Sequence, residues 1–392
     1  MAKPPAIQTP PADRRAAVVR ILEQYDARVE DLAKAISMEM GAPIDMARDS
    51  QSPCLPWHAQ NFLTAFDQIE WIRPLGPHAP NDRIALEPIG VVGLITPWNF
   101  PIAIPAWKAA PALAFGNAVV WKPANLTPAS AVALTEIIAR QDIPAGLFNL
   151  VAGPGRSLGQ HLAEHRGIDA ISFTGSVPVG RGIAAAAVAN MTKVQMEMGS
   201  KNPMLIMDDA DLDLAVSHAA NAAFGGTGQK CTAASRLIVH AAVHDAFVEK
   251  LVKAAEAFQI GHALDPASQI GPVVSAAQLA QNLDYIDLGR REGADLLTGG
   301  TRLSRDTEGY FMAPAVFAGT RNDMRINREE MFAPITCVIK VDSYAEALAT
   351  ANDSEFGLTA GIMTRSLARA SHFRAHMRAG CVMVNLPTAG TD

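Results

Sequence analysis

The chain of 392 residues has few cysteines, few aromatic residues and no excess of positive charge. Its four cysteines, Cys54, Cys231, Cys337 and Cys381, form no CxxC pair, so no disulfide framework and no metal site is expected. The formal net charge is −6, and no basic run interleaved with aromatic residues occurs. This composition excludes an electrostatic surface for nucleic acid or for anionic membranes.

Long hydrophobic runs are also missing, because every apolar stretch is interrupted by a charge or a proline before it reaches transmembrane length. The opening segment MAKPPAIQTPPADRR lacks the apolar core of a signal peptide. Hydrophobic residues nevertheless make up 49% of the chain and charged residues 18%, which is typical of an ordered protein with a large core. We therefore expect a soluble, cytoplasmic protein.

The first 90 residues differ in pattern from the rest of the chain. The first dozen are rich in proline and alanine and are expected to be frayed. Residues 13–40 carry apolar side chains at helical spacing, and Gly41 and Pro43 supply a stop signal. A second helical region is predicted over residues 58–72. Residues 73–90 are expected to be extended or looped, because their prolines remove backbone donors.

From residue 90 onward, short runs rich in valine and isoleucine alternate with alanine-rich helical segments. The first runs are GVVGLITPW, GNAVVWKPA, LFNLVAG, IDAISFTGS and KVQMEMG, and a second alternating block begins with NPMLIMDD. Such alternation predicts βαβ units and mostly parallel sheets. We place a boundary near Gly199, between an α/β domain over residues 13–198 and a second α/β domain over residues 199–392.

Two glycine-containing turns are candidates for a phosphate loop. LVAGPGRSLG carries Gly153, Gly155 and Gly159 but has the third glycine one residue late for the dinucleotide pattern, and a plain turn explains it better. In SFTGSVPVGRGI, a strand ends at Gly175 and Ser176 where a helix begins, and helix N-terminal amides bind phosphate. A strand–turn–helix link without a ligand explains this second stretch equally well.

Three polar residues stand at the ends of predicted strands, where ligands bind in open α/β sheets. Asn99 follows LITPW, Lys122 follows AVVW, and Glu197 lies in VQMEMG. The Lys122 side chain suits a ribose hydroxyl, although a single lysine is more often surface. A carboxylate among apolar neighbours should have a raised pKa, as a general base needs, but Glu197 could also be an ordinary strand residue facing solvent.

Cys231 lies in FGGTGQKCTAASR, after a glycine-rich turn and among small and polar residues. A structural cysteine is usually found in an apolar strand or helix, so these surroundings favour an accessible thiol, while a structural role stays open on this stretch alone. An accessible thiol, an amide, an apolar carboxylate and a dinucleotide site together suit the covalent oxidation of an aldehyde.

Six motifs carry a resemblance to a known family: TPWNFP, WKPA, FTGS, EMGSKNP, GQKCTAASR and REEMFAPI. Their order and approximate spacing resemble those of the aldehyde dehydrogenase superfamily over nearly the whole chain. The resemblance implies an α/β fold with a Rossmann-type cofactor domain, a second α/β catalytic domain and a connecting or oligomerisation segment near residues 69–88. It also implies a homo-oligomer.

The resemblance implies a role for each motif residue. Cys231 would attack the aldehyde, Asn99 and the Cys231 amide would hold the oxyanion, and Glu197 would activate water. The dinucleotide, NAD or NADP, would be held by Trp98, Lys122, Gly175, Ser176, Gly180, Glu330 and Phe332. Among these, Lys122 would bind the adenosine ribose, Trp98 and Ser176 the pyrophosphate, and Glu330 the nicotinamide ribose.

Finer features of the sequence bear on the choice between NAD and NADP and on the choice of aldehyde. Many NAD-preferring members carry a glutamate where this chain has Asn125, and a neutral side chain does not repel a ribose phosphate, so we expect NADP to be accepted alongside NAD. NFPIAIPAWK, GQKCTAASRLIV and VMVNLPTAG resemble the branch that oxidises 2-oxoglutarate semialdehyde. Its carboxylate needs a cation, for which Lys108, Lys230 and Arg325 are candidates. A structural or surface role is more common for each, and none is ranked above the others.

The chain also resembles a member shortened at both ends, because the family continues beyond VNLPTAG. Two alternatives to a hydrolytic dehydrogenase follow. One is a non-catalytic, cofactor-binding remnant of the fold, disabled by truncation. The other passes the acyl group to a thiol such as coenzyme A, but members of that branch typically lack the base, whereas Glu197 is present here.

Overall fold

The computed structural model describes residues 9–388 of the chain. Two compact units are present: unit 1 comprises Met1–Glu39 and Asp45–Met198, and unit 2 comprises Met40–Ile44 and Gly199–Asp392. Most of the segment expected to be frayed lies outside the described residues. Its last part is ordered, since the first helix begins at Pro11, and proline is favoured in the first turn of a helix.

The N-terminal helical region is divided in two. Helix α1 (Pro11–Asp26) and helix α2 (Val29–Met40) are separated by a turn at residues 27–28, which the apolar spacing did not reveal. The stop signal is confirmed, since α2 ends at Met40. Gly41 has φ +83°, a backbone conformation that residues with a side chain rarely adopt. A Cβ atom on Gly41 would also lie 2.7 Å from the Pro272 carbonyl oxygen.

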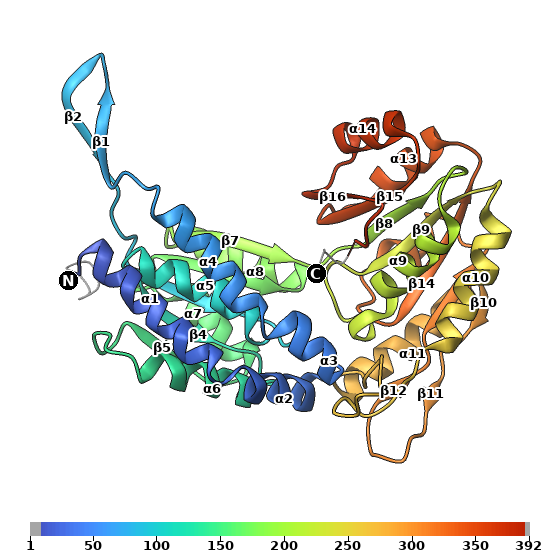
Figure 1. Cartoon of the computed structure of the whole chain (residues 1–392), viewed down its shortest axis with the longest axis horizontal. Helices are drawn as coiled ribbons and strands as arrows, with labels where there is room; N and C mark the ends of the chain where they lie inside the picture. The colour runs from blue at the N-terminus through green and yellow to red at the C-terminus, as the bar shows by residue number, and fades with distance from the viewer. Residues whose placement is uncertain (1–8, 389–392) are drawn as a thin grey trace. The chain divides into compact units, whose positions relative to one another are not determined.

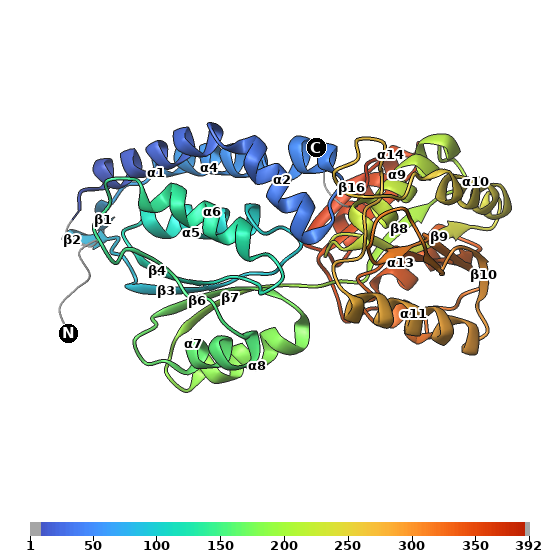
Figure 2. The same ribbon diagram turned by 90° about the horizontal axis from the view of Figure 1, so that it is seen from below.

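Unit 1 is built around a five-stranded parallel sheet in the order β5-β4-β3-β6-β7. Its strands are β3 (Val91–Ile95), β4 (Ala118–Lys122), β5 (Phe148–Leu150), β6 (Ala170–Gly175) and β7 (Lys193–Met198). Figure 2 shows α1, α4, α5 and α6 on one face of this sheet and α7 and α8 on the other. The further helices are α3 (Ile44–Met46), α4 (Cys54–Phe66), α5 (Ala103–Ala114), α6 (Pro128–Ala139), α7 (Gln160–Glu164) and α8 (Val177–Val188).

An antiparallel hairpin extends from unit 1, formed by β1 (Ile72–Gly76) and β2 (Ala79–Ala85) (Figure 1). The predicted extended segment is thus paired with itself, and the predicted helix before it ends earlier than expected, at Phe66. Every residue of β1 and β2 is exposed or half-buried. An oligomerisation role for this hairpin stays a prediction.

Unit 2 contains a seven-stranded sheet in the order β10-β13-β14-β9-β8-β15-β16, parallel except for the β10–β13 pair. Its strands are β8 (Asn202–Ile206), β9 (Ala234–His240), β10 (Asp295–Thr298), β13 (Ala315–Ala318), β14 (Ile335–Val341), β15 (Thr359–Met363) and β16 (Cys381–Val384). A small separate ladder pairs β11 (Arg302–Leu303) with β12 (Phe311–Met312).

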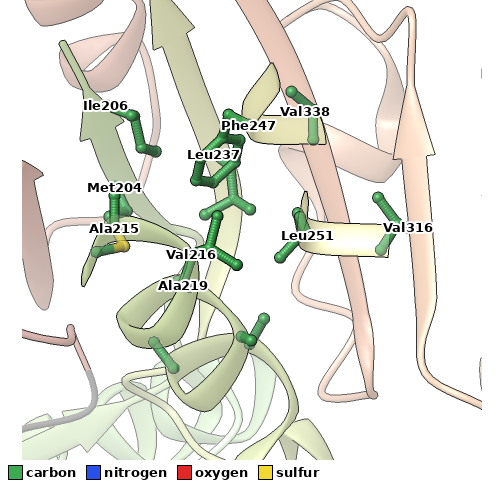
Figure 3. Packing of buried hydrophobic residues seen from close by; sticks show 14 of the residues in the cluster. Met204, Ile206, Ala215, Val216, Ala219, Leu237, Phe247, Leu251, Val316 and Val338 are labelled. Carbon is green, nitrogen blue, oxygen red and sulfur yellow. The ribbon is translucent and has the colours of Figure 1, made fainter. Parts of the chain in front are cut away.

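The helices of unit 2 cover both faces of this sheet. They are α9 (Leu212–Phe224), α10 (His244–Ala257), α11 (Ala276–Arg291), α12 (Arg325–Arg328), α13 (Tyr344–Asn352) and α14 (Leu367–His376). Alternate strand residues point to opposite faces, so Met204 and Ile206 of β8 pack with α9 and α10, as Figure 3 shows, whereas Leu205 packs toward α13 and α14. This two-sided burial explains the continuous apolar runs in the sequence.

Cys337 and Cys381 both lie in strand-like runs of the sequence, which predicts that both thiols are buried. Cys337 of β14 is fully buried, as expected. The same expectation is wrong for Cys381, which is exposed because β16 is the edge strand of the seven-stranded sheet.

Candidate active site

The polar residues predicted at strand ends of unit 1 lie at one edge of the five-stranded sheet. Lys122 closes β4 opposite Ile95 of β3, and Glu197 of β7 lies opposite Thr174 of β6. Asn99 follows β3 by four residues and is 4% exposed. Its carbonyl oxygen accepts a hydrogen bond from the Gln51 side chain at 3.4 Å. The parallel register therefore gathers these groups at the carboxyl edge, where open α/β sheets bind ligands.

Helix α8 begins immediately after β6, as the SFTGS motif predicts. Ser176 is its N-cap residue, is exposed, and makes no capping hydrogen bond with its side chain. Gly175 and Gly180 act through packing, because a Cβ atom at either position would lie 2.6 Å from the Phe173 ring or the Met198 sulfur, respectively. The glycines thus let α8 start close to the sheet with its first amides exposed at the N-terminus.

The Lys122 side chain lies beside the glycine-rich loop that follows β5. Its ammonium group donates to the Pro123 carbonyl at 2.7 Å, and burial lowers its pKa. A Cβ atom on Gly155 would lie 3.6 Å from the Lys122 Nζ atom. The loop that the sequence favours as a plain turn is therefore the neighbour of a predicted cofactor-binding lysine. Two further residues of unit 1 bear on the predicted cofactor site. Trp98 is half-buried, and Asn125, which follows Lys122 in the chain, is exposed.

Glu197 is half-buried, and burial raises its pKa, as the apolar neighbours in the sequence predict. The positive charge of Lys108 on α5 partly opposes this rise. Burial in turn lowers the pKa of Lys108 to about 8, against the attraction of Glu197. Both groups therefore titrate closer to neutrality than they would in water, which suits a base that must gain and lose a proton.

From the sequence, Lys108 is a candidate cation for the substrate or a structural or surface lysine. In the structure its ammonium group donates to Ser172 Oγ at 2.7 Å and to Gln195 Oε1 at 3.1 Å. Ser172 and Gln195 are direct neighbours across β6 and β7, and Gln195 is two residues before Glu197 on the same face of β7. A polar residue two positions before the predicted base was the available signal.

In unit 2, the turn that precedes Cys231 has an unusual backbone. Gly226, Thr227 and Gly228 have φ values of 63°, 61° and 64°, and a non-glycine residue in this region is uncommon. The Thr227 hydroxyl donates to the Gly271 carbonyl at 3.1 Å. A Cβ atom on Gly228 would lie 2.1 Å from the Ala333 carbonyl oxygen. These contacts hold the turn, and Cys231 at its end is half-buried.

Asn202 fixes the other side of Cys231 and was missed from the sequence. Its side-chain amide donates to the carbonyls of Cys231 and Ala233 at 2.7 and 2.9 Å, and its oxygen accepts from the Thr359 amide. Asn202 is 1% exposed and lies at the start of β8. Its position within the EMGSKNP motif was the only signal, because its partners are far away in the chain.

Glu330 and Phe332 lie between α12 and β14. Glu330 accepts a hydrogen bond from the Ser200 amide at 3.1 Å, and its carboxylate covers Gly199, where a Cβ atom would lie 1.9 Å from the nearest oxygen. Burial raises the pKa of Glu330 to about 7. Phe332 has φ +54°, and such strain is often found at functional sites.

The donors of unit 1 suit parts of a dinucleotide. The amides at the N-terminus of α8 and the Ser176 hydroxyl suit phosphate oxygens, and the Lys122 ammonium suits a ribose hydroxyl. Gly155 brings no side chain toward the Lys122 ammonium. These residues of unit 1 therefore fit the phosphate and ribose groups of a dinucleotide. In unit 2, the Glu330 carboxylate taken by itself suits a ribose hydroxyl.

Comparisons with known proteins assign the family. The model of the aldehyde dehydrogenase family matches residues 1–392. An α-ketoglutaric semialdehyde dehydrogenase of Bacillus subtilis (strain 168) is 41% identical over 389 residues, which are 97% of this chain and 78% of that protein. This chain is a member of the aldehyde dehydrogenase family.

Two further relatives agree. An α-ketoglutarate semialdehyde dehydrogenase of Haloferax volcanii is 44% identical over 81% of this chain and 66% of its own length. The crystal structure of betaine aldehyde dehydrogenase from Staphylococcus aureus in complex with NAD+ superimposes with a TM-score of 0.94 at 31% identity, covering 97% of this chain and 76% of that one. The predicted family and fold class are confirmed, and the protein is an aldehyde-oxidising enzyme.

Within residues 9–388, no helix is long and apolar enough to cross a membrane.

Three cations are candidates for binding a substrate carboxylate. Arg325 is exposed and pairs with Glu329 at 2.6 Å, and Lys108 is bound by Ser172 and Gln195. Lys230 is half-buried and directly precedes Cys231.

Proposed function

We propose that this aldehyde dehydrogenase oxidises a small semialdehyde, 2-oxoglutarate semialdehyde, to the carboxylate, with NAD or NADP and with Cys231 as the nucleophile. The observation that carries the proposal is the turn over residues 225–231. Thr227, Gly228 and Asn202 hold it by contacts on separate segments of unit 2, so the thiol is placed by the fold. A nucleophile positioned in this way supports covalent catalysis.

In the proposed reaction, the Cys231 thiolate adds to the carbonyl carbon and forms a thiohemiacetal. The Asn99 side chain and the Cys231 amide donate hydrogen bonds to the oxyanion. When bound, the nicotinamide ring supplies the acceptor for the hydride that leaves the same carbon. Glu197 then removes a proton from water, the water adds to the resulting thioester, and the C–S bond breaks to give the carboxylate and the Cys231 thiol.

Lys122, Ser176, Trp98, Glu330 and Phe332 are proposed to hold the dinucleotide. Because Asn125 is exposed and neutral, nothing at that position repels a ribose phosphate, and we expect NADP to be used alongside NAD. An Asn125→Glu variant should lose activity with NADP more than with NAD. Equal losses with both would contradict this assignment.

The test of the main proposal is formation of reduced cofactor from 2-oxoglutarate semialdehyde, with NAD and with NADP, by the full chain. Cys231→Ala should abolish turnover. Cys381→Ala is the matched control, because this thiol is exposed on the edge strand β16, and it should leave turnover unchanged. Acetaldehyde and betaine aldehyde, assayed in parallel, test the substrate class.

Each outcome has a defined meaning. Turnover that survives in Cys231→Ala contradicts a cysteine nucleophile. Dinucleotide binding without turnover on any aldehyde supports a non-catalytic protein of the same fold. Faster turnover of betaine aldehyde than of the semialdehyde contradicts the substrate assignment but not the chemistry.

A further inference from the structure

Lys201, the residue before β8, is one of the most deeply buried charged residues of unit 2. The whole residue is 1% exposed, and its Nζ atom has no hydrogen-bond partner among residues 9–388. A buried ammonium without such a partner is costly, so a structure that retains one needs a nearby opposite charge or a neutral lysine. The proposed chemistry does not use Lys201.

The neighbouring charged groups are nearly all engaged elsewhere. Arg236 donates to the Lys201 carbonyl at 3.1 Å, and its other donors bind Asn322 and the backbone of α13. Glu329 accepts from Arg325 at 2.6 Å and from Tyr285 at 3.1 Å. The fully buried Cys337 thiol is neutral, because burial raises its pKa to about 11.

Glu330 is the remaining acidic neighbour of Lys201. Among residues 9–388, only the Ser200 amide donates a hydrogen bond to its carboxylate, and that amide belongs to the residue immediately before Lys201. The Glu330 carboxylate thus lies near three groups of one short segment: the Gly199 backbone, the Ser200 amide and the buried Lys201 ammonium. Burial disfavours ionised Glu330, whereas the amide and the ammonium favour it.

We propose that Lys201 is a positioning residue whose buried ammonium favours the ionised form of the Glu330 carboxylate near neutral pH. The ionised carboxylate is the form that accepts hydrogen bonds from two ribose hydroxyls, whereas the protonated form loses acceptor capacity. This inference rests on the proposed role of Glu330 in holding the nicotinamide ribose. It gives a role to an interior lysine of unit 2 whose ammonium has no hydrogen-bond partner between residues 9 and 388.

The direct test measures the ionisation of Glu330 without any dinucleotide. The carboxyl infrared band is followed between pH 5 and 9, and the Glu330→Gln spectrum is subtracted to isolate this group. In Lys201→Met the midpoint should move up by about one pH unit or more, since an opposite charge at close range has an effect of this size. Lys201→Arg, which keeps the charge, should restore a midpoint near that of the wild type.

The matched control is Lys253→Met, which removes one positive charge from an exposed pair on α10 in the same unit. It should leave the Glu330 midpoint unchanged, because an exposed charge is screened by solvent. An unchanged midpoint in a folded Lys201→Met protein overturns the inference.

A reciprocal measurement covers the case in which Lys201→Met does not fold. Coupling between two ionising groups is mutual, so Glu330→Gln should lower the pKa of Lys201. Carbon-13 NMR of labelled lysine side chains follows this pKa, with Lys201→Arg used to assign the resonance. A Lys201 pKa that does not change in Glu330→Gln also overturns the inference.

Dinucleotide affinity separates this inference from the proposed function. Binding of NADH, measured by calorimetry across the same pH range, should strengthen as Glu330 ionises, and this rise should move to higher pH in Lys201→Met. If Glu330→Gln binds NADH as tightly as the wild type, the ribose role of Glu330 is wrong. The infrared midpoints still decide whether Lys201 controls its ionisation.

Discussion

Unit 1 and unit 2 each contain a half-buried carboxylate near a buried lysine, and the two pairs differ in how the lysine is held. In unit 1, burial raises the pKa of Glu197 and Lys108 opposes the rise. In unit 2, burial raises the pKa of Glu330 and Lys201 opposes it. The pKa of each lysine is lowered to about 8.

The difference lies in the hydrogen bonds. Lys108 is held by Ser172 and Gln195, whereas the Lys201 ammonium has no hydrogen-bond partner in the described part of the chain. In unit 2 the amide of Ser200 binds the carboxylate instead. A hydrogen bond donated to a carboxylate favours its ionised form. In unit 2 the Ser200 amide therefore acts together with the Lys201 charge in favouring the ionised carboxylate, whereas in unit 1 the charge of Lys108 opposes the raised pKa of Glu197.

The largest expected effect comes from removing each carboxylate. Glu197→Gln should lower kcat by about 10²- to 10⁴-fold, the usual contribution of a general base, while a first burst of reduced cofactor remains. Glu330→Gln should cost about 10- to 100-fold in dinucleotide affinity, because a hydrogen bond to a charged group contributes about 1.5–3 kcal/mol. Stopped-flow and steady-state assays separate the two; loss of the burst in Glu197→Gln contradicts its role as the base for hydrolysis.

The second effect concerns stability and distinguishes Lys201 from an ordinary lysine. Its pKa is lowered from 10.5 to about 8, so the unfolded chain holds this proton to higher pH than the folded chain. Between these two pKa values the unfolded state binds more protons than the folded state. The free energy of unfolding therefore increases as the pH rises, by an amount on the order of a few kcal/mol.

Urea denaturation of the wild type and Lys201→Met at pH 7 and pH 10 measures this effect. The wild type should gain stability relative to the variant as the pH rises. A difference between the two proteins that stays constant over this range would show that the Lys201 pKa is not lowered.

The third effect is a shift in the pH dependence of turnover. Lys108→Met removes the charge that opposes the raised pKa of Glu197, so the acid limb of the pH–kcat profile should move to higher pH by about one unit. At high pH the variant should approach the wild-type rate. A uniform loss of rate at every pH would instead indicate a structural role for Lys108.

The smallest effect tests the hydrogen bonds that distinguish the two lysines. Ser172→Ala removes one acceptor of Lys108 and should cost about 1 kcal/mol of stability, because Gln195 remains as an acceptor. Ser157→Ala, which removes a long bond of 3.4 Å on an exposed turn, is the matched control and should change stability little. Equal effects in both variants would contradict a specific network around Lys108.

The sequence predicted the elements of the sheets because their signals are local. Valine and isoleucine runs that end in glycine or proline correspond to β3, β4, β6, β8 and β14, and the alanine-rich segments correspond to helices. Errors arose where local spacing was uninformative: the turn at residues 27–28, and the exposure of Cys381, which depends on which strand lies at the edge.

By itself, the sequence determined the alternation of strands and helices, the family, and the residue types available for chemistry, since each follows from periodicity or from motifs within a few residues. Only the tertiary structure decided how those residues are held. Asn202 reaches Cys231 across 29 positions, and Lys108 reaches Gln195 across 87. Burial and charge proximity, which set the pKa of Glu197 and Glu330, depend on such distant contacts and leave no local pattern.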